Sequence, residues 1–151
     1  QILIANLGLV ERMVELAENE EDQVRDKLIE NALEDSISAF DGYARERCAG
    51  LYEKISFQNI EGAREKLIND HAIDISSGLT QEQWNFVLVK FQMRHLLAHK
   101  MGVIDEEYAR KTNGDMSQVG RKVSVSKEDV LELINHIKIL ADNLAKNVER
   151  R

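Results

Sequence analysis

Three titratable side chains stand close together in a stretch of sequence that is otherwise mostly apolar. They are Arg94, His95 and His99, and they lie between Trp84 and Met101. A guanidinium group buried in such a helix costs several kcal/mol unless it is paired or faces water, so its presence calls for a reason. Imidazoles transfer protons near neutral pH, and a guanidinium can hold a phosphate through two parallel hydrogen bonds. These residue types favour cleavage of RNA without a metal ion, in which the 2′-OH loses a proton, the 5′-oxygen gains one and a cation stabilises the phosphorus transition state.

Two other interpretations fit the same residues. Arg94 could pair inside the core with an acidic residue of another helix, the candidates being Glu30, Glu34 and Asp35. In that case the histidines would bond to the backbone. His95 and His99 also have the i, i+4 spacing of helical zinc ligands. However, Leu96 stands where the metalloprotease motif carries its catalytic Glu, so we expect no metal and no other cofactor.

The positions of the charged groups on one helix predict a partner. Arg94 and His99 are five residues apart, which is about 140° around an ideal helix. A twofold dimer would bring two copies of Arg94, His95 and His99 into one cleft. We therefore expect a homodimer formed through the helix over residues 81–100.

The composition predicts that helices position these residues. The chain has no proline and only eight glycines in 151 residues, so few positions break a helix. Apolar spacing predicts helices over residues 2–17, 29–55, 57–70, 81–100, 106–111 and 127–148. Asp41 and Gly42 could kink the second of these. The sequence thus predicts one all-α domain over residues 1–151, an up-and-down bundle of four to five main helices.

Helix ends are marked by polar residues and glycine. Thr80 with Gln83, and Ser126 with Asp129, have the spacing of capping boxes. Gly102 is expected to end the helix over residues 81–100. The polar segment 115–126 is expected to be a loop or a short extended piece.

The hexapeptide Arg94-His95-Leu96-Leu97-Ala98-His99 resembles the Arg-x4-6-His signature of the HEPN superfamily. The continuation from Lys100 to Tyr108 is similar to the segment after that motif in many bacterial HEPN domains, and so is the order of helices. The resemblance implies a metal-independent endoribonuclease of toxin–antitoxin, phage-defence or stress systems, with its active cleft at a homodimer interface. It implies that Arg94 stabilises the phosphate, His99 is the general acid/base and His95 is the supporting polar residue. Met101 stands where HEPN toxins silenced by nucleotide attachment often carry Tyr, so that regulation is not carried over.

Only one part of the chain has the positive charge that would favour binding of RNA. The net charge is −7, yet residues 90–122 hold seven basic and four acidic side chains. A positive rim on an acidic body could guide an RNA strand into one cleft, although a solvated helix face would look the same. The candidate RNA-binding residues are Lys90, Lys100, Arg110, Lys111, Arg121 and Lys122. The acidic balance favours an alternative function, a non-catalytic HEPN-like module for dimerisation or nucleotide binding.

Several further residues carry weaker signals. Trp84 and Phe91 are expected in the core, and Cys48 is expected to be a buried, inert thiol. His71 and His136 are lone histidines, expected as caps or surface groups near helix ends. Three amides could read bases, but their spacing does not distinguish them from loop and cap residues; they are Gln58, Asn59 and Asn113.

The remaining expectations concern location and partners. No apolar run approaches the roughly 20 residues that cross a bilayer, so no membrane association is expected. A single cysteine allows no intramolecular disulfide, which favours the reducing cytoplasm. An antitoxin or another defence-system protein is a possible partner under the resemblance.

Overall fold

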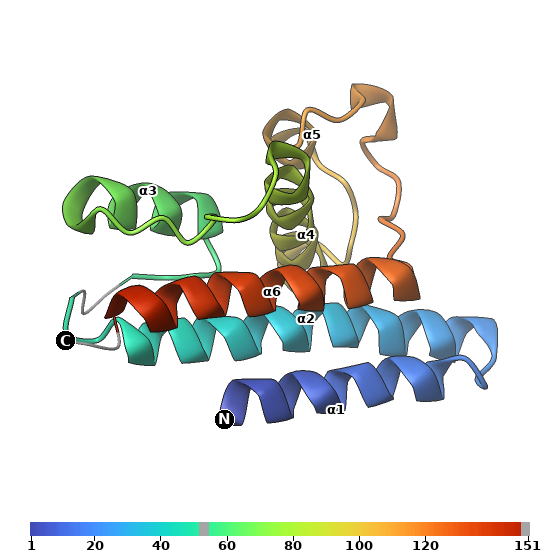
Figure 1. The fold of residues 1–151 in the computed structure, drawn as a ribbon. Helices are drawn as coiled ribbons and strands as arrows, with labels where there is room; N and C mark the ends of the chain where they lie inside the picture. The colour runs from blue at the N-terminus through green and yellow to red at the C-terminus, as the bar shows by residue number, and fades with distance from the viewer. Residues whose placement is uncertain (52–54, 149–151) are drawn as a thin grey trace.

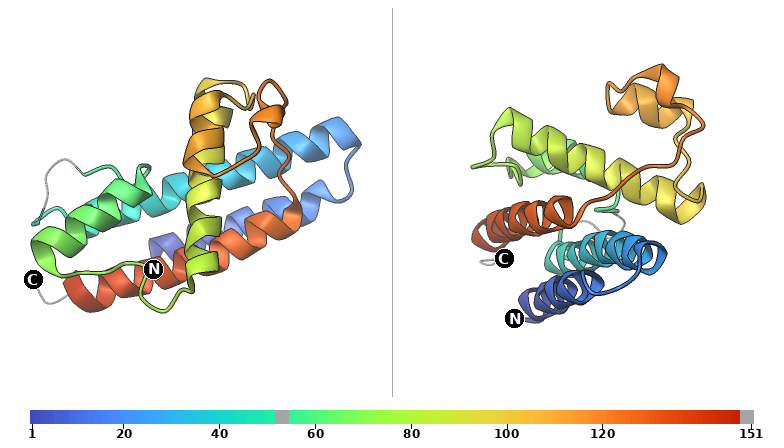
Figure 2. Two further views of the ribbon diagram at one scale, coloured as in Figure 1. Left: turned by 90° about the horizontal axis from the view of Figure 1, so that it is seen from above. Right: turned by 90° about the vertical axis from the view of Figure 1, so that its right-hand side faces the viewer.

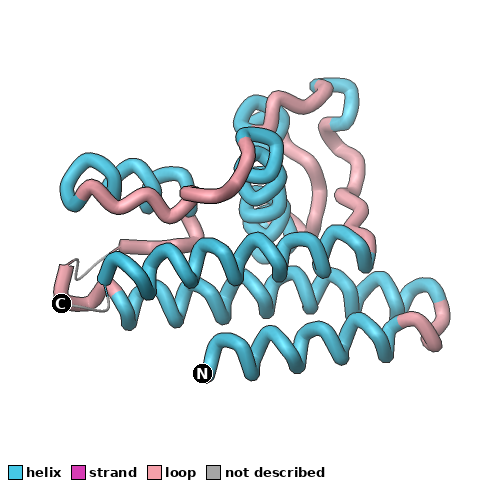
Figure 3. Tube along the Cα trace, in the orientation of Figure 1, coloured by secondary structure: helices cyan, strands magenta, loops and turns pink. Residues whose placement is uncertain are grey.

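The computed structural model describes residues 1–51 and 55–148, and this part of the chain is all-α. Its elements are α1 (Ile2–Ala17), α2 (Asp22–Arg47), α3 (Ile60–His71), α4 (Gln81–His99), α5 (Glu106–Lys111), the 3-10 turn η1 (Met116–Gln118) and α6 (Lys127–Val148). Loops and turns connect them (Figure 3). Within the described residues no strand forms, and Val103 and Lys122 make a single isolated bridge. The expected helical class is confirmed, and no described helix has the length and apolarity of a membrane span.

The long helices form a layer that α4 crosses. Helices α1, α2 and α6 lie side by side, while α3, α4 and α5 lie above them (Figure 1). Viewed from above, α4 runs steeply across α2 and α6 (Figure 2). Helices α2 and α6 run in the same direction, so the arrangement is not a simple up-and-down bundle. The connection through residues 112–126 lets α6 start at the same end as α2.

Apolar stripes hold this layer together. Helix α1 buries Leu3, Leu7, Val10, Val14 and Ala17, as its periodicity predicts. The stripe of α6 is also buried, and both helices contact α2. Helix α4 is covered on several sides because it contacts α2, α3, α5 and α6. Helices of the same chain therefore already cover part of its apolar surface, without a second copy of the protein.

Helix α2 ends earlier than predicted. The apolar spacing suggested a helix to Ile55, but α2 stops at Arg47, with Cys48 as its cap and Ala49 and Gly50 in a turn. Ile55 is buried, yet it lies in the connection that follows. The apolar spacing continues beyond the end of the helix because Ile55, outside the helix, is also buried in the core. The helix passes through Asp41 and Gly42 without interruption.

Helix α3 begins later than predicted because a polar residue caps it. Asn59 accepts a hydrogen bond from the N–H of Gly62, and the helix starts at Ile60 instead of near Phe57. Phe57 packs edge-on against Phe40, with ring centroids 5.9 Å apart. Its N–H donates to Oδ1 of the buried Asp41 at 2.9 Å. This contact fixes the segment before α3 against α2.

Both predicted capping boxes are present. The N–H of Gln83 donates to the Thr80 hydroxyl, and the Gln83 side chain accepts from Thr80 N–H. Ser126 and Asp129 make the equivalent pair of bonds at the start of α6. At the other end of α4, Gly102 has φ 78° and donates its N–H to the Leu96 carbonyl at 2.9 Å. The cap residue is Lys100 and not the predicted Gly102, and Met101 (φ 55°) and Gly102 both adopt the left-handed backbone that ends the helix just after the histidines.

Candidate functional site

Arg94, His95 and His99 line a single hollow of about 330 Å³ at the C-terminal end of α4. We call this the motif hollow. Helix α4 forms one wall, the segment before α3 forms another, and α5 forms a third. Phe91 is 2% exposed and also borders the hollow, so it supplies an apolar floor. Three segments far apart in sequence therefore build the site around the motif residues.

The two imidazoles lie next to one another on the accessible side of α4. Their ring centroids are 4.9 Å apart and the rings are tilted by 53°. Both histidines are exposed. The spacing of one helical turn and the solvent access mean that both rings can contact a molecule in the hollow.

Arg94 has an unusual environment. It is half-buried, and its Nε is buried with no hydrogen-bond partner among the described residues. The alternative in which Arg94 pairs with Glu30, Glu34 or Asp35 is wrong for Glu30, whose carboxylate accepts from Lys122 Nζ at 2.9 Å. Among the described residues, no hydrogen bond or ion pair joins Arg94 to Glu34 or Asp35. The guanidinium thus borders the hollow and forms no ion pair with any of the residues that the structure describes.

The segment before α3 brings amide and hydroxyl groups to the site. Ser56, Gln58 and Asn59 line the motif hollow. Gln58 Nε2 donates to Asp41 Oδ2 at 3.1 Å, so α2 fixes this wall through a buried carboxylate. The sequence offered Gln58 and Asn59 only as undistinguished polar residues. Their proximity to α4 depends on the loop packing and has no local sequence signal.

Helix α5 brings a charged pair to the same hollow. Lys111 Nζ lies 2.7 Å from Glu107 Oε1, and both residues line the site. The hydrogen bond and charge of Lys111 lower the pKa of Glu107, and the nearby His95 acts in the same direction. Glu107 was not predicted as a site residue, although its i, i+4 spacing from Lys111 is a recognisable signal in the sequence. Gln92 also lines the hollow, and nothing in its sequence context singled it out.

The six candidate RNA-binding residues fall into different environments. Lys111 lines the motif hollow, and Lys100, Arg110 and Arg121 are exposed. Lys122 is exposed but paired with Glu30. Lys90 does not lie where an RNA-binding residue was predicted, because its side chain is only 9% exposed. Its Nζ lies 3.2 Å from Asp129 Oδ2 and over the Phe86 ring. Lys90 therefore ties α4 to α6 and cannot present its charge to RNA.

Other residues resolve as core. Trp84 and Phe91 are buried, as expected. Cys48 is also buried, as expected, and desolvation raises the pKa of its thiol to about 11, which favours the unreactive protonated form. His136 differs from the expectation of a cap or surface group. It is buried in the middle of α6, edge-on to Phe86 and 3.3 Å from Glu132, because the apolar stripe of α6 includes its position.

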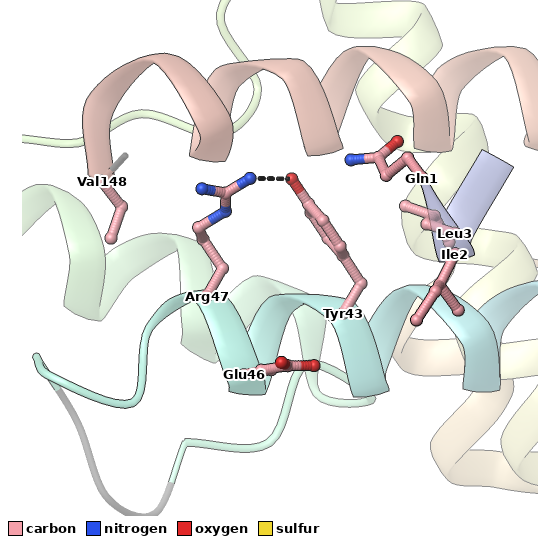
Figure 4. A pocket seen from close by; sticks show the side chains of 7 residues that line it. All are labelled: Gln1, Ile2, Leu3, Tyr43, Glu46, Arg47 and Val148. Carbon is pink, nitrogen blue, oxygen red and sulfur yellow. Dashed lines mark hydrogen bonds between the residues drawn. The ribbon is translucent and has the colours of Figure 1, made fainter. Parts of the chain in front are cut away.

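A larger hollow of about 400 Å³ lies between the start of α1 and the end of α2. Figure 4 shows Arg47 turned toward Tyr43, and Nη2 of Arg47 donates to the Tyr43 hydroxyl at 3.2 Å. The guanidinium also lies 5.5 Å from the centre of the Tyr43 ring. Because this arginine is already partnered and no histidine lines the hollow, its chemistry is poorer than that of the motif hollow.

Within the described residues, no group of three or more His, Cys, Asp or Glu side chains is arranged to hold a metal ion. The chain matches no protein-family model, no curated protein and no solved structure. The assignment of a function therefore depends on the chemistry of the motif hollow itself.

Proposed function

We propose that this chain is a metal-independent endoribonuclease of the HEPN type, a toxin or phage-defence effector that acts in the cytoplasm. The observation that carries the proposal is a half-buried arginine with an unpartnered Nε beside two exposed imidazoles in one hollow. A buried donor without a partner costs stability, and a site that binds an anion explains why such a group is kept. A phosphodiester in the hollow would supply an acceptor for this half-buried guanidinium.

The proposed reaction starts with attack of a ribose 2′-OH on the adjacent phosphorus. His99 removes the 2′-OH proton, and the new P–O bond forms as the bond to the 5′-oxygen breaks. An imidazolium returns a proton to that oxygen, so the products are a 2′,3′-cyclic phosphate and a 5′-OH end. Arg94 stabilises the negative charge on the phosphoryl oxygens as the phosphorus becomes five-coordinate.

The neighbouring groups have supporting roles in the proposal. His95 is close enough to His99 to contact the same substrate. Lys111 adds a second cation at the edge of the hollow, where its pairing with Glu107 restrains it. A homodimer through α4 would add the second copy of His99 as the proton donor, and an antitoxin or defence partner would restrain the activity.

The test is cleavage of a labelled single-stranded RNA in the presence of EDTA. Wild type should give 2′,3′-cyclic phosphate ends, and His99→Ala should lower the rate about 10²- to 10⁴-fold, the usual range for a general acid/base. His71→Ala is the matched control because His71 lies at the end of α3, outside the residues that line the hollow. Equal rates for wild type and His99→Ala would refute the site. Chelator-sensitive cleavage would refute the metal-independent mechanism.

The net charge of −7 favours a second candidate, a non-catalytic dimerisation or nucleotide-binding module. Such a module would bind a nucleotide in the motif hollow without cutting RNA. Saturable nucleotide binding by wild type, lost in Arg94→Met, together with no cleavage at any protein concentration, would support it over the nuclease.

A further inference from the structure

A second hollow adjoins the motif hollow. It measures about 320 Å³ and lies between α3 and α4. We call it the α3 hollow. The two hollows share Asn59, Gln92 and Lys111 in their walls, so they lie next to one another along α4, and we call the pair the groove. A volume near 300 Å³ is at the lower end of the range for small-molecule sites.

The two hollows have opposite charge. The motif hollow contains Arg94 and two imidazoles beside the Lys111–Glu107 pair. The α3 hollow is lined by the exposed carboxylates of Glu61 and Glu65, with Lys111 at its edge. Among the residues described, neither carboxylate makes an ion pair or a side-chain hydrogen bond. A phosphate would be repelled there, but a group that donates hydrogen bonds would be bound. A nucleotide has both parts, an anionic phosphate and a base with donor groups.

We propose that the α3 hollow binds the base next to the scissile phosphate and prefers guanine. This inference rests on the proposed nuclease function. The N1–H and N2–H₂ groups of guanine lie side by side, and one carboxylate can accept from both. Lys111 lines both hollows, and an ammonium N–H that Glu107 does not use can donate to guanine O6. The half-buried Leu88 supplies an apolar surface for the base.

The other bases satisfy these groups less well. Adenine and cytosine each offer only an exocyclic amine to a carboxylate. Uracil offers a single N3–H between two carbonyl oxygens, and those oxygens are repelled by Glu61 and Glu65. A well-matched pair of hydrogen bonds discriminates between bases by about tenfold or more. The expected order of affinity is guanine, then adenine and cytosine, then uracil.

The test is binding of four 2′-O-methyl RNA trinucleotides that differ only in the central base, measured by calorimetry. The methyl groups block 2′-OH attack, so binding is measured apart from cleavage. Wild type should bind the guanine form at least about tenfold more tightly than the uracil form. In Glu61→Gln/Glu65→Gln this preference should fall below about twofold. The control Glu20→Gln/Glu82→Gln makes the same change in charge at exposed positions outside the groove and should keep the preference.

The outcomes separate this inference from the proposed function. If wild type cleaves RNA but binds all four trinucleotides equally, or keeps its guanine preference in Glu61→Gln/Glu65→Gln, the base site is wrong and the nuclease stands. If the preference is present and is lost in that variant, but no RNA is cleaved, the base site stands and the nuclease is wrong. If no trinucleotide binds and no RNA is cleaved, both are wrong.

Discussion

Replacing Arg94 with methionine should stabilise the folded protein while abolishing RNA cleavage. The reason is the environment of Nε, which is buried without a hydrogen-bond partner among the described residues. Most substitutions of a half-buried residue destabilise a protein, so a gain in stability would be a specific signature of a group kept for binding.

The magnitude follows from the cost of an unpaired donor. Leaving a buried polar group unsatisfied costs about 1–3 kcal/mol. Because Arg94 is only half-buried, we expect the lower end of that range. Methionine is unbranched and keeps most of the packing of the arginine stem. The free energy of unfolding should therefore rise by about 1 kcal/mol, which is about 2–4 °C in Tm for a chain of this size.

Arg64 provides the matched control because its guanidinium is partnered. Its Nε donates to the Ser76 hydroxyl at 2.9 Å and lies 3.6 Å from Asp74, and the group stacks over the Trp84 ring at 5.1 Å. Arg64→Met loses a hydrogen bond, a partly exposed ion pair and a cation–π contact, about 2 kcal/mol together. The same chemical change should thus have opposite signs at the two positions.

The assay is urea unfolding of wild type, Arg94→Met and Arg64→Met at pH 7, with RNA cleavage measured on the same samples. A change in midpoint at constant m-value reports stability directly. The reasoning is refuted if Arg94→Met loses as much stability as Arg64→Met. That result would mean that Arg94 is a structural residue, and its loss of cleavage could then reflect unfolding.

Three further predictions concern groups outside the groove. Asp129→Ala should lower the free energy of unfolding by about 3 kcal/mol, because it leaves the buried ammonium of Lys90 without a partner and removes a helix cap. Lys90→Met should lower it by less than about 1 kcal/mol. Equal losses for the two variants in urea unfolding would contradict this asymmetry. With its thiol pKa at about 11, Cys48 should react with iodoacetamide at pH 8 more than about 100-fold slower than free cysteine, and fast labelling of the folded protein would show that the thiol is exposed. Burial alone would raise the pKa of Asp74, but the hydrogen bonds from Ser76 outweigh this effect and the net pKa is lowered. The carboxylate therefore stabilises the fold above about pH 4, and this stabilisation is lost as the pH falls through the folded pKa. Asp74→Asn should therefore be less stable than wild type at pH 7 by an amount that shrinks in acid, and a gap independent of pH in thermal unfolding would rule out the charge as its cause.

Local signals predicted the elements well where caps define them. Helix α4 and helix α6 begin where Thr80 and Ser126 place them, because a capping box is completed within one turn of the chain. Helix α2 was predicted too long because apolar spacing alone marked its end, and a loop residue such as Ile55 can be buried as deeply as a helical one.

Contacts between distant segments could not be predicted in the same way. Lys122 and Glu30 are 92 positions apart and Lys90 and Asp129 are 39 apart, so nothing local marks either pair. Lys90 was assigned to an RNA-binding rim because its charge was visible in the sequence and its burial was not. His136 was misplaced because it was treated as a surface residue type, although it stands three positions after Leu133 and four before Leu140 on the apolar side of α6.

The sequence by itself determined the helical class, the caps of the two longest late helices and the presence of an arginine and two histidines near the end of one apolar helix. Those properties depend on residue type and on spacing within a few turns. Only the tertiary structure decided that Nε of Arg94 has no partner among the described residues, that the segment before α3 and helix α5 line the same hollow, and that a carboxylate-lined hollow adjoins it. Burial, charge pairing and enclosure depend on distances between segments remote in sequence, and folding alone sets those distances.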